Sequence, residues 1–475
     1  MQRKYLIFLL IIFLLGAAAR VIYFRCNSYN IDMGDDEPWS KINIALEWAR
    51  DNDTTIFCFG PLHTYLISCL WFFDGANVVI LSRILTLLFG ILFMPVYFCV
   101  LREFFDEKIA FWGLFLLAIY PLHIHLSSTS LAAVPALFLF FSSLYFLKRF
   151  IGNKRTVYLF ISAAALNLAC MLRFEYWIFI ALLPLMLCFE FKFSRDFFLY
   201  LALTSIFALF WCSVNYQKTG DPFFFIKTSA IQIQFTMQGI PLRERAIGFI
   251  CALGTTLSLP IFILCIVGYP LSLRKLSENG PFLFMFTFVL FSYTLKSIHG
   301  SFLYEILRYS LLPGALFIPF GAAFLNAIAR KKRIRASIKT GTFLVIVCLC
   351  LFYSAKTSKA FCEFSVPGES TLDMVTWLKS NILPDDKVIL ESGRSHPFTV
   401  LNAHLSFRQV VRYDSFAAQK DIAALERYFF VSDYVVVFKQ LGLFREAVLL
   451  PSVRDAITNV YENEDWQIFK VKHNA

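Results

Sequence analysis

Charged residues are scarce in this sequence. Only 16% of the 475 residues are Asp, Glu, Lys or Arg, while 58% are hydrophobic and the mean hydropathy is +0.64. A soluble domain carries roughly 25% charged residues, so this chain has too few polar groups to cover the surface of a soluble fold. Its apolar residues also gather in blocks of roughly 20, the length of helix needed to cross a hydrocarbon core. The composition predicts an integral membrane protein.

Other familiar signals are missing as well. The 12 cysteines form no Cys-x-x-Cys pair and no Cys/His zinc spacing, and most lie within apolar blocks as small hydrophobic residues. The formal net charge of +11 comes from short basic clusters between apolar blocks, which topology explains, so we expect no nucleic-acid partner. No cleavage site follows the first apolar block, because Ala17-Ala18-Ala19 leads directly into Arg20. We expect that block to be retained as the first span.

Eleven apolar segments are predicted to cross the membrane as helices. If the N-terminus is cytoplasmic, the cytoplasmic segments hold 18 Lys and Arg residues, against 2 in the three short outer turns. This contrast follows the positive-inside rule and supports both the count and the orientation. The predicted spans are residues 5–24, 78–100, 109–126, 130–147, 156–172, 176–190, 197–213, 246–270, 281–296, 306–328 and 340–355.

Three segments on the outer side are long. Two are loops, residues 25–77 and 214–245, within a transmembrane domain of residues 1–355. The third is the tail, residues 356–475, which is too polar to span a membrane. Its helical spacing at 371–380 and its short β-rich runs predict a small α/β domain outside the cytoplasm. The fold class is therefore a polytopic α-helical membrane protein with a small soluble α/β domain on the outer face, in a cell membrane that we expect to be prokaryotic.

The first outer loop holds an acidic motif, Asp35-Asp36-Glu37 followed by Pro38. One interpretation is a capped turn before an interfacial helix. The other is a general base or a cation ligand. Further along, Gly60-Pro61 marks a break, and His63 begins an apolar stretch either as a structural residue or as part of a site.

Several charged residues lie at the outer edges of predicted spans. Charges at membrane depth are costly and usually face a polar cavity. An Arg173–Glu175 pair and snorkelling arginines are the structural interpretation. The functional interpretation is one outward cavity in which guanidinium groups bind phosphate oxygens in bidentate fashion. The residues concerned are Arg20, Arg83, Arg173, Glu175, Lys296, Glu305 and Arg308.

The order and spacing of these motifs resemble the GT-C superfamily of membrane glycosyltransferases. The nearest pattern is that of the protein O-mannosyltransferase and aminoarabinose transferase group, glycosyltransferase family 39. The resemblance spans roughly the first 315 residues. Its elements are Asp35-Asp36-Glu37, Gly60-Pro61-Leu62-His63, the stretch from Arg83 to Gly90, Arg173-Phe174-Glu175-Tyr176-Trp177, Gly220-Asp221-Pro222, and Arg308-Tyr309 with Pro313.

The resemblance implies an inverting transfer of a sugar from a polyprenyl-phosphate donor to a protein, lipid or glycan acceptor on the outer face. It implies Asp36 as the base, with Asp35 as the alternative and Glu37 beside them. Arg173 and Arg308, then Arg83 and Lys296, are implied to bind the donor phosphate. His63, Glu175 and Tyr309 are implied to line the cavity.

Two departures from the family pattern stand out. Cys58 and Phe59 occupy positions where many members carry a basic residue, and the turn Ser127-Ser128-Thr129-Ser130 lacks the acid or Arg found in many members. Metal dependence varies among such proteins, so the use of a divalent cation stays open, and no metal ligands are assigned. The alternative from another class is a secondary transporter or flippase of a lipid-linked or anionic substrate.

Overall fold

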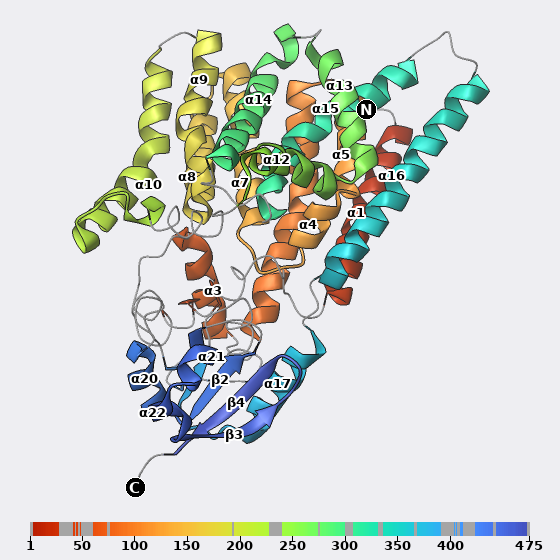
Figure 1. Ribbon diagram of the computed structural model, residues 1–475. Helices are drawn as coiled ribbons and strands as arrows, with labels where there is room; N and C mark the ends of the chain where they lie inside the picture. Colours follow the sequence, from red (N-terminus) through yellow and green to blue (C-terminus); the bar gives the residue numbers. More distant parts are fainter. Residues whose placement is uncertain are drawn as a thin grey trace. The chain divides into compact units, whose positions relative to one another are not determined.

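The computed structural model describes two compact units (Figure 1). The helical unit comprises Met1–Asn30 and Asp53–Glu363, and the C-terminal unit comprises Ile31–Asn52 and Phe364–Ala475. The residues described are 3–27, 41–42, 44–45, 48, 60–73, 77–191, 194–227, 240–273, 276–299, 307–330, 336–364, 368–390, 403, 405, 409–411, 423–439 and 443–472.

Helices make up the first unit, as the apolar blocks predict. Each predicted span coincides with one helix or with two helices separated by a break. The helices are α1 (Arg3–Cys26), α3 (Pro61–Phe73), α4 (Val78–Phe104), α5 (Glu107–Ala118), α6 (Pro121–Leu126), α7 (Ala133–Asn153), α8 (Thr156–Leu172), η1 (Phe174–Ile178), α9 (Phe179–Phe191), α10 (Arg195–Thr219), α12 (Leu242–Leu257), α13 (Leu259–Leu273), α14 (Leu276–Ile298), η2 (Leu307–Ser310), α15 (Leu311–Arg330) and α16 (Ala336–Phe364).

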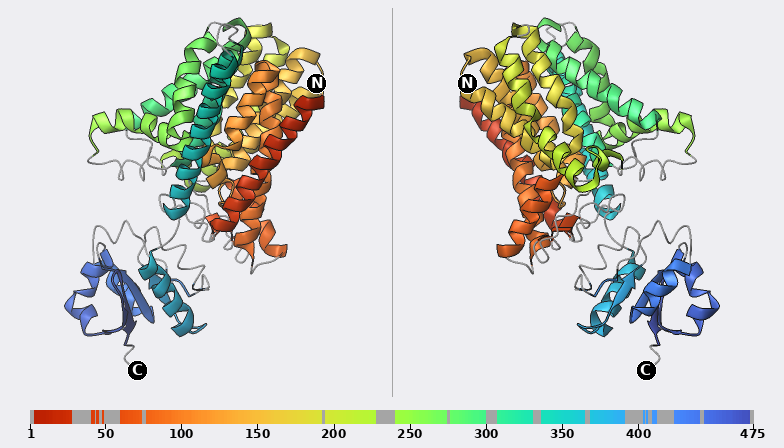
Figure 2. Two further views of the ribbon diagram at one scale, coloured as in Figure 1. Left: turned by 90° about the vertical axis from the view of Figure 1, so that its right-hand side faces the viewer. Right: turned by 90° about the vertical axis from the view of Figure 1, so that its left-hand side faces the viewer.

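Among the described residues, seven helices are long and apolar enough to span a membrane, and eight if α12 and α13 form one span. The protein is therefore an integral, multi-pass membrane protein. The eleven predicted spans are not all of this kind, since α8 and residues Phe174–Leu187 form shorter apolar helices. The span predicted at 246–270 is not one straight helix, because α12 and α13 are bent by 114° (Figure 2) at Ser258, whose φ is +68°.

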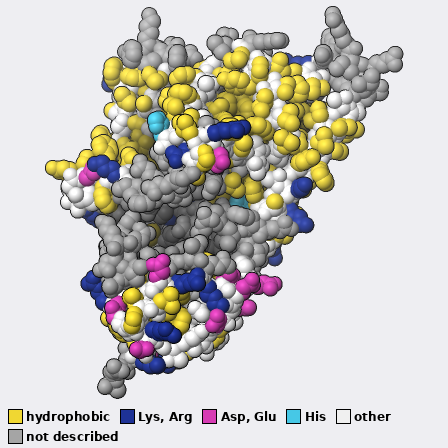
Figure 3. Space-filling model, viewed as in Figure 1, with side chains coloured by type: hydrophobic (Ala, Val, Ile, Leu, Met, Phe, Trp, Pro, Cys, Tyr) yellow, Lys and Arg dark blue, Asp and Glu magenta, His cyan; other side chains and the backbone are white. Residues whose placement is uncertain are grey.

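Lipid-facing surfaces are evident on the outermost helices. Leu15 on α1, Leu209 on α10 and Phe352 on α16 are 65%, 70% and 64% exposed. Hydrophobic side chains cover much of the described face of this unit in the space-filling view (Figure 3). Apolar patches of this extent mark a membrane or binding surface in a folded protein, and the helix lengths identify it as a membrane surface.

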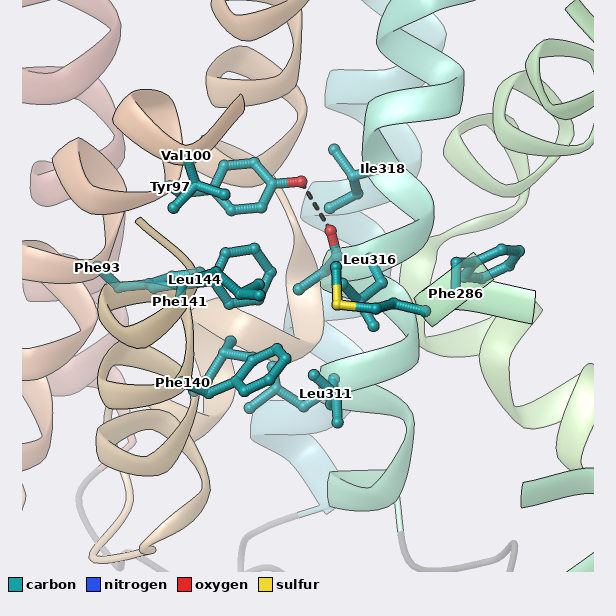
Figure 4. Packing of buried hydrophobic residues seen from close by; sticks show 14 of the residues in the cluster. Phe93, Tyr97, Val100, Phe140, Phe141, Leu144, Phe286, Leu311, Leu316 and Ile318 are labelled. Carbon is teal, nitrogen blue, oxygen red and sulfur yellow. Dashed lines mark hydrogen bonds between the residues drawn. The ribbon is translucent and has the colours of Figure 1, made fainter. Parts of the chain in front are cut away.

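The core lies between α4, α7 and α15, where aromatic rings from the first two helices meet aliphatic residues of the third (Figure 4). One hydrogen bond compensates for a proline there. Pro319 has no N–H for the carbonyl of Ala315, four residues earlier. The hydroxyl of Tyr97, on α4, donates to that carbonyl at 2.7 Å. The Ala315 carbonyl, which Pro319 leaves without its usual helical donor, therefore accepts a hydrogen bond from a neighbouring helix.

The C-terminal unit has the predicted α/β character. Its sheet has the order β1-β2-β4-β3, with β1 (Val388–Leu390) parallel to β2 (Tyr434–Phe438) and the other pairs antiparallel. The remaining strands are β3 (Ile457–Glu462) and β4 (Trp466–Val471), and the helices are α17 (Glu369–Asn381), α20 (Ala423–Phe430), α21 (Leu443–Val448) and α22 (Pro451–Arg454). Four of the six residues of β4 and all three of β1 are buried, as a sheet covered by helices requires.

Two details differ from the predicted division of the chain. Helix α16 continues past residue 355 to Phe364. Its last turns, which include Lys356 and Lys359, lie beyond the apolar stretch on which the predicted boundary was based. In addition, part of the first predicted outer loop groups with the C-terminal unit. There Lys41, Ile44, Ala45 and Trp48 are helical and buried.

Candidate functional site

A polar hollow lies in the helical unit where several helices end. It encloses about 250 Å³, part of it open to the surroundings. Helices α8 and α14 reach it with their C-terminal ends, and α7 and α15 with their N-terminal ends, an alternation that brings distant motifs to one end of the bundle. The lining residues are Ala133, Arg173, Glu175, Tyr176, Tyr293, Arg308, Tyr309, Leu311 and Leu312.

Arg173 is placed by the end of α8. Its backbone is extended (φ −151°, ψ 129°), so the chain leaves the helix there and turns into the 3₁₀ helix η1. Gly60 packs against the backbone of Met171 and Leu172, so closely that a Cβ at Gly60 would overlap their carbonyl groups. The Gly60-Pro61 motif therefore lies directly beside the Arg173 motif, although more than a hundred residues separate them.

Arg173 forms a two-point ion pair with Glu175. Its Nη2 lies 2.5 Å from Oε1 and its Nε lies 3.2 Å from Oε2. The Arg173 and Glu175 side chains are 8% and 21% exposed. A pair this well covered holds both groups in one orientation and keeps both charged. The Arg173–Glu175 ion pair fits both interpretations from the sequence, because it is a structural contact whose two residues also line the hollow.

The two arginines of the hollow share one aromatic ring. The guanidinium carbon of Arg173 is 5.5 Å from the centroid of the Tyr309 ring, and that of Arg308 is 5.2 Å from it. Both distances are within cation–π range. Arg308 is 8% exposed and lies in η2, immediately before α15. The arrangement sets two guanidinium groups around a single tyrosine in a small space.

Lys296 adds a further positive charge near the hollow. It lies in the last turn of α14, with its Nζ 5.9 Å from the centroid of the Tyr293 ring, and it is close enough to act on the charge of Glu175. Among the described lining residues, Arg173, Glu175 and Arg308 sum to one positive charge, and Lys296 adds another nearby. Guanidinium groups in such a lining suit phosphate oxygens.

Arg83 and Arg20 lie elsewhere and bond to backbone carbonyls. Arg83 donates to the carbonyls of Ser128 (2.8 Å), Phe24 (3.1 Å) and Asn27, and its guanidinium stacks on the Phe24 ring. Fully buried Arg20 donates to carbonyls at the end of α5 and to His123. These guanidinium groups satisfy helix ends and a turn that would otherwise lack donors. Neither lines the hollow.

The other predicted residues divide into two groups. His63 is fully buried in α3, which contacts α4 and α8. Asp35, Asp36, Glu37 and Glu305 lie outside the described residues. In the part of the chain that the structure describes, no three His, Cys, Asp or Glu residues are grouped as metal ligands would be.

Two tyrosines of the hollow were not predicted from the sequence. Tyr293 precedes Lys296 by three positions, a spacing that puts both on one helix face, and this was the available signal. Tyr176 lay within a recognised motif but carried no distinguishing feature.

The three phenylalanines after Pro222 differ in burial. Phe225 is fully buried against Phe174 (4.4 Å between ring centroids) and Trp177 (5.2 Å), whereas Phe223 and Phe224 are 51% and 38% exposed.

No known family profile matches the chain, and no curated protein matches it by sequence. Solved structures do match it by fold. ArnT from Cupriavidus metallidurans bound to undecaprenyl phosphate has a TM-score of 0.65 at 13% identity, covering 96% of this chain and 97% of that one. The oligosaccharyltransferase AglB from Archaeoglobus fulgidus, in complex with an inhibitory peptide and a dolichol-phosphate, has a TM-score of 0.59 at 14% identity, covering 92% and 69%.

These similarities define the fold. Both solved proteins are membrane glycosyltransferases with the GT-C fold, and this chain has that fold over nearly its whole length. The fold that the motifs suggested is therefore confirmed.

Proposed function

We propose that this protein is an inverting glycosyltransferase that moves a sugar from a polyprenyl-phosphate donor to an acceptor outside the cytoplasm. The observation that carries the proposal is the hollow itself. Arg173 and Arg308 flank Tyr309 within about 6 Å of its ring, and the apolar Leu311 and Leu312 line the same space. Paired guanidinium groups beside an apolar wall suit a phosphate attached to a hydrocarbon chain.

The charge of the hollow favours the product of such a reaction. The donor carries one negative charge on its phosphodiester, and the released polyprenyl phosphate carries up to two. The described groups at the hollow include three cations, Arg173, Arg308 and Lys296, beside Glu175. Groups that bind the leaving phosphate more strongly as its charge grows stabilise the transition state more than the ground state.

In the proposed reaction, the carboxylate of Asp36 takes the proton from an acceptor hydroxyl. The acceptor oxygen attacks the anomeric carbon as the bond from that carbon to the phosphate oxygen breaks. The bonding pair leaves with the phosphate, and the configuration at the sugar inverts. Asp35 is the alternative base, and Glu37 adjoins them. A divalent cation used in this step would be held by these acids.

The orientation belongs to the proposal. We infer a cytoplasmic N-terminus and an extracytoplasmic C-terminal unit. The partners are a protein, lipid or glycan acceptor, in addition to the donor and membrane lipid. The positive-inside distribution supports this orientation. We assign to the C-terminal unit a role in covering the site or binding the acceptor.

A secondary transporter or flippase remains the rival function. The bend between α12 and α13 is a break of the type that transporters use. However, the residues around it, from Gly254 to Pro260, are uncharged. The charged groups lie at the end of the bundle instead, which favours chemistry at one face over passage across the membrane.

A donor screen tests the proposal. Purified full-length protein in liposomes is given polyprenyl-phosphate sugars with candidate acceptors, with and without EDTA, and polyprenyl phosphate is measured by mass spectrometry. We expect its release from at least one donor, and its loss in Asp36→Asn. Movement of intact donor across the bilayer with no release would support the rival function. Full release in both Asp36→Asn and Asp35→Asn would overturn the base assignment.

A further inference from the structure

Three helix breaks meet at the hydroxyl of one buried tyrosine. Tyr120 lies between α5 and α6, at the N-cap of α6, and its side chain is completely buried. Its hydroxyl donates to the carbonyl of Ser310 at 3.2 Å, where η2 passes into α15. Thr256, two residues before the break between α12 and α13, lies beside the same hydroxyl.

The neighbouring residues leave room for this contact. A Cβ at Gly314 would overlap the Tyr120 hydroxyl, so glycine at this position allows the ring to reach the first turn of α15. Pro313 next to it lies in the first turn of α15, where backbone N–H groups have no partner within the helix. Hydrogen bonds from outside the helix therefore contribute to where this turn lies.

The turn that Tyr120 holds is the one that carries Arg308. Ser310 is only two residues from Arg308 and is 1% exposed, and η2 contacts α6, α12 and α15. Fixing the Ser310 carbonyl therefore fixes the short 3₁₀ helix from which Arg308 and Tyr309 extend into the hollow. A shift of about 1 Å in a binding group is enough to weaken its interactions substantially.

We propose that Tyr120 is a positioning residue for the phosphate-binding side of the hollow: its hydroxyl fixes η2 so that Arg308 and Tyr309 face the lipid phosphate. The inference rests on the proposed function for the identity of the ligand. The positioning itself is a statement about η2 and is testable without any ligand.

Tyr97 provides a matched control for Tyr120. It is also a completely buried tyrosine, and its hydroxyl also donates to a carbonyl of α15, that of Ala315, at 2.7 Å. That carbonyl lies more than a turn beyond η2. Tyr120→Phe and Tyr97→Phe therefore remove the same atom and the same type of hydrogen bond, to Ser310 of η2 and to Ala315 of α15 respectively. Only the first bond holds the Arg308 turn.

The experiment compares wild type, Tyr120→Phe and Tyr97→Phe as full-length protein in lipid nanodiscs. The first measurement is hydrogen–deuterium exchange of peptides covering residues 307–312. The second is the Kd for polyprenyl phosphate. Tyr120→Phe is expected to speed exchange in these peptides and to raise the Kd about fivefold, the effect of losing one ordinary hydrogen bond. Tyr97→Phe is expected to leave the Kd and the 307–312 exchange at wild-type values, while lowering thermal stability.

The outcomes separate the two proposals. Unchanged exchange at 307–312 in Tyr120→Phe overturns the positioning role, whatever the lipid result. Equal changes in exchange and Kd in both variants also overturn it, since a general loss of stability then explains them. Faster exchange in Tyr120→Phe alone, with no binding of polyprenyl phosphate by wild type, supports the positioning of η2 and contradicts the proposed function. If Tyr120→Phe does not fold, Gly314→Ala, which crowds the same hydroxyl, is used in its place with the same expected results.

Discussion

Arg173 holds the carboxylate of Glu175 by two hydrogen bonds, from Nη2 at 2.5 Å and from Nε at 3.2 Å. The two residues are separated by one position in the sequence and lie where α8 ends, so the pair forms within a single turn. Both side chains are largely covered. The pair keeps the Arg173 guanidinium in one orientation in the lining of the hollow.

This pair should show strong energetic coupling. Arg173→Met leaves a covered carboxylate without its partner, and Glu175→Gln leaves a covered cation. We expect the double variant to lose less stability than the two single losses together, by about 1–3 kcal/mol, in unfolding measured in detergent. Additive losses would show that the contact contributes nothing beyond what an exposed pair does.

Tyr309 is expected to act through its ring and not through its hydroxyl. Tyr309→Phe keeps the surface on which both arginines lie, so the KM for the lipid donor should stay within about twofold of wild type. Tyr309→Leu removes it and should raise that KM about tenfold. The comparison is made with the donor identified by the screen. Equal effects of the two substitutions would assign the role to the hydroxyl instead.

A separate prediction concerns stability in the core. Tyr97→Phe leaves the Ala315 carbonyl buried without a donor and should lower the free energy of unfolding by about 1–3 kcal/mol. Pro319→Ala restores the backbone N–H that this carbonyl lacks, so it should recover much of the loss in the Tyr97→Phe background. Thermal unfolding of the four variants measures both effects. No recovery in the double variant would argue against the proline as the reason for the tyrosine.

Reporter fusions test the orientation. A reporter enzyme that is active only outside the cytoplasm should be active when fused after Ala475. The same reporter fused after Gly152, at the end of α7, should be inactive, because the positive-inside rule assigns the Lys154 turn to the cytoplasm. The reverse pattern would place the hollow on the cytoplasmic side and remove the proposed outer-face chemistry.

The sequence predicts the helices of this fold better than it predicts their breaks. The long apolar blocks identify α1, α4, α7 and α10 because a membrane span needs only length and hydrophobicity. Those two properties are unchanged where α12 bends into α13, so nothing in the hydropathy distinguishes the break at Ser258. The sequence likewise predicts no span at α3, because its 13 residues are too few to cross a membrane.

The residues of the candidate site are likewise only partly predictable from the sequence. Arg173 and Arg308 were recognisable because a charge at a membrane edge is costly and needs a reason. Arg83 met the same criterion, yet its guanidinium serves the carbonyls of Phe24, Asn27 and Ser128. The sequence does not reveal which charges find backbone partners, since those partners come from turns that only the folded chain brings together. Tyr120 was missed for the same reason.

If the hollow holds a lipid phosphate, the protein should bind polyprenyl phosphate with a Kd measurable in lipid nanodiscs. Wild type, Arg173→Gln, Arg308→Gln and the control Arg243→Gln, an exposed arginine on α12, are compared at one salt concentration. Wild type and Arg243→Gln should bind alike, and each hollow variant should bind at least about tenfold more weakly. Equal affinities in all four proteins would contradict a phosphate site in the hollow.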